Sequence, residues 1–174
     1  IVLAFYQNIT KFYPNGITWN KEDDHVDTLD QIAKLAVLVA KMRAVLPKQS
    51  QKYEGKPLVE DPTRIFMTLS GIVKCYAFIH GKTHVSPDEL KVAFRIATDS
   101  VPPERSSVLH ALVNNGGVIT SKKYSDLEQV SSKTTFTRFH EMVRLGICEP
   151  TKKSNKTNPL DSIVLKDDWL WLQN

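Results

Sequence analysis

The sequence has few of the residues and motifs that catalysis and metal binding require. Its only two cysteines are Cys75 and Cys148, and its five histidines do not cluster with either, so the close, paired ligand spacing of a zinc site is missing. The phosphate loop GxxxxGK[ST] and the motifs GxGxxG, HExxH and GxSxG are missing as well. We therefore predict no metal site and no self-sufficient enzyme in this chain, and we expect both thiols to be buried and reduced.

Long apolar runs are scarce too. The run at the amino terminus is too short to cross a bilayer, and it lacks the charged segment and small-residue cleavage site of a signal peptide. We expect no membrane partner, and a location in the cytoplasm or nucleoid, or in the nucleus of a eukaryote. Because the chain starts at Ile1 without an initiator Met, we expect it to be an excised piece of a longer protein.

The composition itself is that of a globular protein. Of 174 residues, 41% are hydrophobic and 24% are charged, which is enough for one large domain or two small ones. Lys and Arg number 23 against 19 Asp and Glu, a net charge of +4. A surplus this small permits either a nucleic acid or an acidic protein as partner, so the distribution of charge has to discriminate between them.

Helical periodicity dominates the first hundred residues. Apolar residues recur every three or four positions over residues 28–46 and 62–80, and the face of the second stretch is almost wholly apolar as far as Ile79. The segment between them, residues 47–61, is polar and contains Gly and Pro. It is therefore predicted to be a loop.

A third helix has an explicit start signal. Ser86 is expected to be its N-cap, Pro87 its first residue, and Glu89 the second member of a capping box. The two prolines within Val101–Glu104 then end the helical pattern, because proline cannot continue a helix. This break separates two expected domains, residues 1–102 and 103–174.

After the break the pattern predicts short elements of mixed type. They are a helix, a strand, two further helices, a strand that leads into a lysine-rich arm, and a last strand, at residues 104–117, 118–120, 122–130, 131–145, 147–159 and 161–173. This order is typical of a winged helix, a helix-turn-helix with a β-hairpin wing. In the last strand Trp169 and Trp171 alternate with leucines, so one of the two pairs is expected to pack inward.

The stretch Val130–Pro150 is predicted to contain the recognition helix of that fold. With an N-cap at Ser131 or Ser132, one side of the helix packs and the other faces outward. The packing side holds Phe136, Phe139, Met142, Val143 and Leu145, and the outer side holds Lys133, Thr134, Thr137, Arg138 and Glu141. Gly146 supplies the left-handed turn into the wing.

Charge supports duplex DNA as the partner of this face. Residues 122–156 hold eight basic and four acidic side chains. Arg and Lys bind guanine edges or phosphates, and hydroxyl groups bind phosphate oxygens. The candidate DNA-binding residues are Lys122, Lys123, Ser132, Lys133, Thr134, Thr137, Arg138, Lys152, Lys153 and Lys156. The alternative is a scaffold without DNA binding, whose winged helix and exposed tryptophans dock a protein.

Three features of the first hundred residues resemble the lid of AAA+ ATPases. They are Arg64 at the head of a helix, the helix end Ala77–Gly81, and the helix opening Val85–Leu90, "VSPDEL". As an ordered set they are similar to the arrangement in MCM-like helicases, the MoxR group and origin-recognition ATPases, several of which carry a winged helix directly after the lid. The resemblance covers about Thr28 to Trp171.

The resemblance implies a mainly α fold, with a helical lid-like bundle followed by the winged helix. It also implies that Arg64 is a sensor 2 residue, whose guanidinium reaches the γ-phosphate of ATP bound by a neighbouring core domain. That core is absent from the sequence, so ATP and Mg²⁺ are expected only with it, as is any homo-oligomer. The resemblance thus implies that the longer protein is a helicase or initiator ATPase acting in DNA replication.

Overall fold

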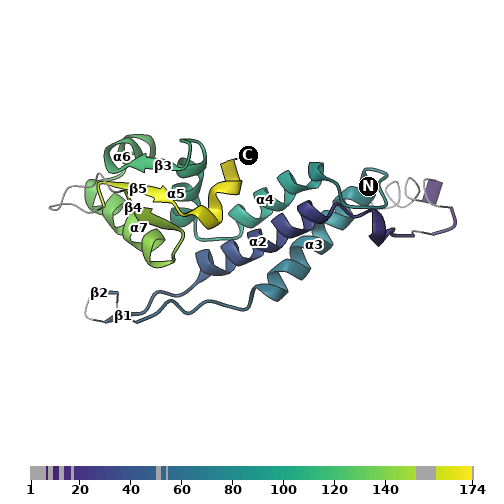
Figure 1. Cartoon of the computed structure of the whole chain (residues 1–174), viewed down its shortest axis with the longest axis horizontal. Coiled ribbons are helices and arrows are strands. Elements are labelled where there is room, and N and C mark those ends of the chain that lie inside the picture. The colour runs from purple at the N-terminus through teal and green to yellow at the C-terminus, as the bar shows by residue number, and fades with distance from the viewer. Residues whose placement is uncertain are drawn as a thin grey trace. The chain divides into compact units, whose positions relative to one another are not determined.

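Most of the chain is helical, and a small antiparallel sheet lies towards the carboxyl end (Figure 1). The computed structural model describes residues 7, 10–11, 14–16, 18–49, 52–53, 55–151 and 160–173. The chain divides into two compact units, one of residues 1–37 and 62–97, the other of residues 38–61 and 98–174. Residues 38–61, expected in the first domain, thus group with the carboxyl-terminal residues.

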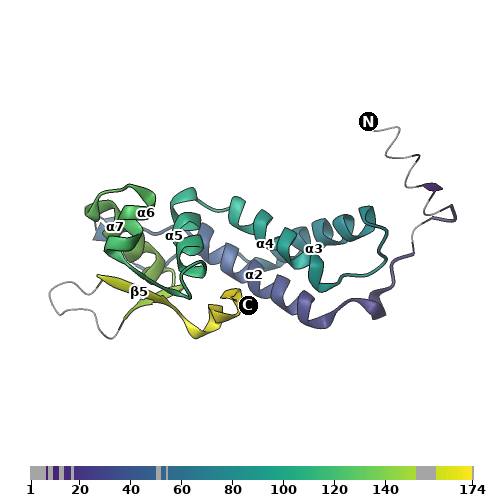
Figure 2. The ribbon, with the colours of Figure 1, turned by 90° about the horizontal axis from the view of Figure 1, so that it is seen from above.

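The first unit is built from helices. It contains the 3-10 helices η1 (Lys21–Asp23) and η2 (Pro87–Glu89), the first part of α2 (Val26–Arg43), α3 (Pro62–Ile79) and most of α4 (Leu90–Asp99). The predicted helices at residues 28–46 and 62–80 are confirmed to within a few residues. In two perpendicular views these helices run alongside one another (Figures 1 and 2).

Helix α3 buries a narrower face than the sequence predicts. Its buried residues are Ile65, Leu69, Val73 and Ala77, a single row with a spacing of four. Ile79, predicted to be in the core, is exposed, because it lies two positions beyond the last member of that row. Cys75 is exposed for the same reason, so its predicted burial was wrong, while Cys148 is buried as expected.

The second unit combines the end of α2 with all the described strands. Residues 47–61, predicted to be a loop, include the hairpin of β1 (Lys48–Gln49) and β2 (Lys52–Tyr53), and Val45 pairs with Leu58 beneath it. The elements that follow are α5 (Pro103–Val113), β3 (Val118–Thr120), α6 (Ser121–Glu128), α7 (Ser132–Arg144), β4 (Cys148–Pro150), β5 (Ser162–Leu165) and η3 (Asp167–Gln173).

The sheet of the second unit places its last strand in the middle. The order is β3-β5-β4, both pairs are antiparallel, and the register sets Val118 opposite Val164 and Cys148 opposite Leu165. One face of the sheet packs against α5, α6 and α7 around a core of Leu109, Leu112, Ile119, Tyr124, Phe139, Met142, Ile147 and Ile163. Removal of this apolar surface from water is the main stabilising contribution to the unit.

The run that contains Trp169 and Trp171 is not a strand. Strand β5 ends at Leu165, and the tryptophans lie in the 3-10 helix η3. Trp169 is buried and its Nε1 donates to the carbonyl oxygen of Gly146 at 3.4 Å, whereas Trp171 is half-buried. The predicted strand alternation fails because Asp167 and Asp168 start a helical turn instead.

Within the described part of the chain, no helix combines the length and the apolar character that crossing a membrane requires.

Candidate nucleic-acid interface

Helix α7 has the start and the end that the sequence predicts. Ser131 is its N-cap, and its Oγ accepts a hydrogen bond from the backbone N–H of Thr134 at 3.2 Å. At the other end Gly146 has a φ of 70°, a left-handed conformation that glycine adopts without strain. The chain then enters β4, so these two residues mark where the helix starts and where it ends.

The packing side of α7 differs from the prediction at two positions, because Phe136 is exposed and Val143 is half-buried. Phe139 and Met142 are buried as expected, but the third buried residue is Thr135, and Phe136 is 45% exposed. Thr135, Phe139 and Met142 have the spacing four and three of one helix face, and Phe136 lies about 100° away from Thr135 around the axis. The prediction that Phe136 is in the core was therefore wrong.

The outer side of α7 is polar around this exposed ring. Ser132, Lys133 and Thr137 are exposed, and Thr134 is half-buried. His140 lies one turn after Phe136, with the two ring planes 19° apart and the centroids 6.3 Å apart. The exposed face thus presents a cation, two hydroxyl groups and an aromatic ring to solvent.

Arg138 does not face outward as the sequence predicts. Its Nη1 donates to the hydroxyl oxygen of Tyr124 at 2.8 Å and lies 4.0 Å from Oε2 of Glu128. The Tyr124 hydroxyl also lies 2.7 Å from Oγ of Ser107. Because Tyr124 is fully buried, these bonds provide its hydroxyl with partners and connect α5, α6 and α7. Arg138 thus holds the helices together instead of projecting from them.

Glu141, also predicted to be on the outer side, is half-buried against Arg105 of α5. Arg105 Nε lies 3.2 Å from Glu141 Oε2, and its Nη1 donates to the carbonyl oxygens of Met42 and Ala44 at 2.7 and 2.8 Å. The guanidinium therefore provides partners for two carbonyl groups at the end of α2, which lack them within the helix. Sequence reasoning missed Arg105 because its partners are 36 to 63 residues away.

Lys122 and Lys123 are exposed in the first turn of α6. The N-cap of this helix is Thr120, whose Oγ1 accepts from the backbone N–H of Lys123 at 3.3 Å. The same turn borders a shallow hollow lined by Thr120, Lys122, Lys123, Asp126 and Leu127. The carboxylate of Asp126 offsets part of the positive charge there, so the site is a weakly basic surface and not a deep anion pocket.

The segment predicted to be the wing follows β4 and precedes β5. The backbone N–H of Thr151 donates to the carbonyl oxygen of Ser162 at 3.0 Å, which extends the pairing of Pro150 with Ile163 by one step. The predicted contact residues Lys152, Lys153 and Lys156 lie outside the described residues. Their contribution to the interface stays a prediction.

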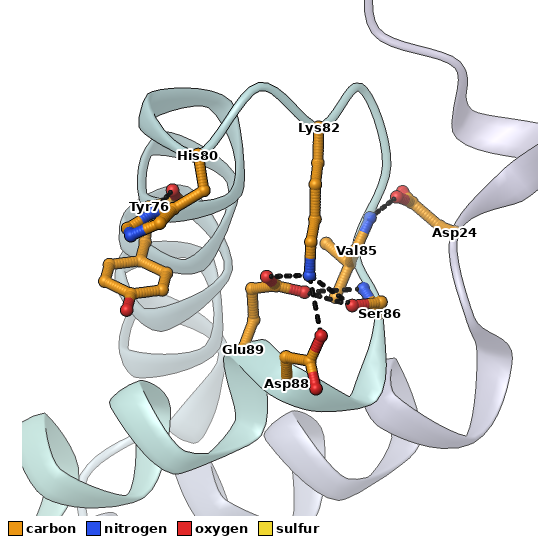
Figure 3. A network of polar contacts seen from close by, with 8 residues as sticks. All are labelled: Asp24, Tyr76, His80, Lys82, Val85, Ser86, Asp88 and Glu89. Carbon is orange, nitrogen blue, oxygen red and sulfur yellow. Dashed lines mark hydrogen bonds and ion pairs between the residues drawn. The ribbon is translucent and has the colours of Figure 1, made fainter.

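Arg64 is exposed in the first turn of α3. The predicted capping box further along the first unit is present, with Glu89 Oε2 accepting from the backbone N–H of Ser86 at 2.8 Å (Figure 3). Lys82 Nζ donates to Glu89 Oε1 at 2.8 Å and to Asp88 Oδ2 at 2.9 Å. These bonds fix the turn before α4, and Asp24 adds a bond from the backbone N–H of Val85 at 2.7 Å.

The titration of this network follows from its geometry. Burial raises the pKa of the Glu89 carboxyl, but the hydrogen bonds from Lys82 and Ser86 lower it by more, so the pKa is below its ordinary value. The hydrogen bonds that Lys82 donates to Glu89 and Asp88 raise the pKa of Lys82. The network has a structural role, because the charge of Lys82 is paired with the charges of Asp88 and Glu89 within the turn.

Neither a group of metal ligands among the described residues nor a similar known protein was found that would assign a further role to this site. Across the part of the chain that the structure describes, His, Cys, Asp and Glu side chains form no group of three or more that could hold a metal ion. Burial raises the pKa of the Cys148 thiol, which disfavours the thiolate that binds metals. Comparisons with protein-family models, with curated proteins and with solved structures find no match to this chain.

Proposed function

We propose that the second unit is a winged-helix module that binds duplex DNA through the outer face of α7 and the first turn of α6. One observation carries the proposal: Lys133 and Thr137 are exposed one turn apart on α7, while Thr135, Phe139 and Met142 on the other side of the helix pack in the core, and Ser132 is exposed in the first turn. The element order from α5 to β5 and the sheet order β3-β5-β4 support the fold assignment.

The physical basis of binding is contact with phosphate. Exposed lysine ammonium groups release counterions when they neutralise phosphates, and the exposed hydroxyl of Ser132 is a donor for a phosphate oxygen. The hydroxyl of Thr137 donates to the backbone carbonyl oxygen of Lys133 at 3.0 Å. Lys122 and Lys123 supply a second cationic point on α6, at the start of the helix that precedes α7. Arg138 is left out of this set, because its guanidinium is held by Tyr124 and Glu128.

We further propose that the chain is the carboxyl-terminal region of a DNA-acting AAA+ ATPase of helicase or initiator type. In this proposal the helices of the first unit form the lid, and Arg64 senses the γ-phosphate of ATP held with Mg²⁺ by a separate core domain. The exposure of Arg64 in the first turn of α3 and the capped turn at Ser86 support it. The nucleotide itself would be bound by the core.

The first experiment is fluorescence anisotropy of a labelled duplex at two salt concentrations. We expect binding that weakens steeply with salt, and Lys133→Ala should weaken it and reduce the slope of log K against log salt by about 1. A Lys122→Ala, Lys123→Ala double variant should reduce the slope by about 2. Lys91→Ala, which removes an exposed lysine of the first unit, is the matched control and should change neither. No binding by the wild type at low salt would refute the proposal.

A protein-docking module is the second candidate. Leu127 of α6 is 57% exposed and Leu170 of η3 is exposed too, and large apolar side chains on a surface contribute free energy when a partner covers them. The buried Trp169 does not take part in such a surface. Under this reading Lys133→Ala leaves partner binding unchanged, and Leu127→Ser weakens it.

A further inference from the structure

Phe136 is an exposed aromatic residue half-way along α7, on the flank of its outer face. The residue is 45% exposed, whereas Phe139, three residues later, is fully buried. Thr135 occupies the core position that Phe136 leaves. A phenyl ring in water is unfavourable, and covering it with an apolar group contributes binding free energy.

The neighbours of Phe136 indicate what covers it. Lys133 lies one turn before it, His140 one turn after it, and Thr137 next to it, and Lys133 and Thr137 are exposed. At these spacings the four side chains share one face of the helix. DNA provides both kinds of group on one surface, with phosphates for the lysine beside apolar groups on the bases.

The major groove of DNA offers one such apolar group, the C5-methyl group of thymine. The groove is about 12 Å wide and admits an α-helix of about 10–12 Å diameter, whose central outward residues then face the base edges. From this geometry we propose that Phe136 contacts thymine methyl groups in the major groove and so gives the interface a preference for thymine-containing sites. The proposal rests on the proposed binding of duplex DNA by α7.

The test isolates the methyl group. Two labelled duplexes of about two helical turns are compared, one of alternating dA and dT and one of alternating dA and dU, which differ only in the C5-methyl groups. We expect the wild-type chain to bind the dT duplex about three- to fivefold more tightly, which corresponds to one well-covered methyl group. Phe136→Ala should remove the difference, and Phe136→Leu, which keeps an apolar side chain, should keep part of it.

Lys133→Ala separates the two proposals. It should weaken binding to both duplexes by the same factor and leave their ratio unchanged, because it removes only charge. If the wild type binds both duplexes equally and Lys133→Ala still weakens binding, the thymine contact is refuted while duplex binding stands. If the wild type binds neither duplex at low salt, duplex binding fails. Tighter binding of a single strand than of either duplex, lost in Phe136→Ala, would overturn the thymine contact in favour of stacking on unpaired bases.

Discussion

Arg105 and Glu141 form an ion pair that joins helix α5 to helix α7, with 3.2 Å between Nε and Oε2. The same guanidinium donates to the carbonyl oxygens of Met42 and Ala44 at the end of α2. One side chain therefore connects Glu141, one turn after Thr137 on α7, to the end of the helix that enters the unit from the amino-terminal side. The planar guanidinium donates to three acceptors at once, and the single ammonium group of a lysine cannot reproduce this geometry.

We predict that Arg105→Ala lowers the free energy of unfolding by about 2–4 kcal/mol, because it leaves two carbonyl groups and a half-buried carboxylate without their partner. Arg105→Lys should recover only part of the loss. Urea unfolding followed by circular dichroism measures both. Lys123→Ala, at an exposed position, is the control and should stay within about 0.5 kcal/mol of the wild type. A change that small in Arg105→Ala would contradict the role assigned to the guanidinium.

A second prediction concerns Thr135, which is fully buried on the packing side of α7. Among the described residues its Oγ1 has no hydrogen-bond partner, although its backbone N–H donates to the carbonyl oxygen of Ser131 at 3.0 Å. Thr135→Val keeps the shape and replaces the hydroxyl by a methyl group, so we expect the free energy of unfolding to rise by about 1 kcal/mol. Thermal unfolding checks this.

Thr135→Ser provides the contrasting variant for that site. It keeps the hydroxyl and removes the methyl group, so it should be less stable than the wild type. A loss of stability in Thr135→Val would mean that the hydroxyl has a stabilising partner after all.

A third prediction concerns the pH dependence contributed by Glu89. Its pKa is lowered in the folded state from an ordinary value of 4.5, so its stabilising contribution is present above pH 4.5 and is lost as the pH falls through the folded-state pKa below that value. Glu89→Gln should therefore be less stable at neutral pH and should show a flatter fall of stability below pH 4.5.

The measurement is the thermal unfolding midpoint from about pH 6 to about pH 3. Glu104→Gln, at an exposed position of α5, is the matched control and should keep the wild-type pH profile. Lys82, which pairs with Glu89, affects stability at the alkaline end of the pH range. Because its pKa is raised above 10.5, its contribution is present below that pH and is lost only at higher pH. An unchanged acid profile in Glu89→Gln would show that the carboxylate does not contribute.

Local sequence signals determined where the helices begin and end. The serine caps at Ser86 and Ser131, the prolines of Val101–Glu104 and the turn at Gly146 act through bonds and backbone angles within a few residues, so the sequence alone was sufficient to predict them. The order of helices and strands from α5 to β5 follows from the same signals, but the 3-10 helix η3 after β5 was predicted to be strand.

Tertiary structure decided which residues of each helix are buried and which residues meet. A helical pattern shifted by one residue still looks amphipathic, so only packing against α5 and the sheet selected Thr135 for the core and left Phe136 exposed. Arg138 turns inward to donate to the Tyr124 hydroxyl, a contact between helices that the sequence of α7 alone does not contain. Arg105 pairs with Glu141, which lies 36 residues away in the sequence. At such a separation the sequence pattern does not indicate which residues are in contact.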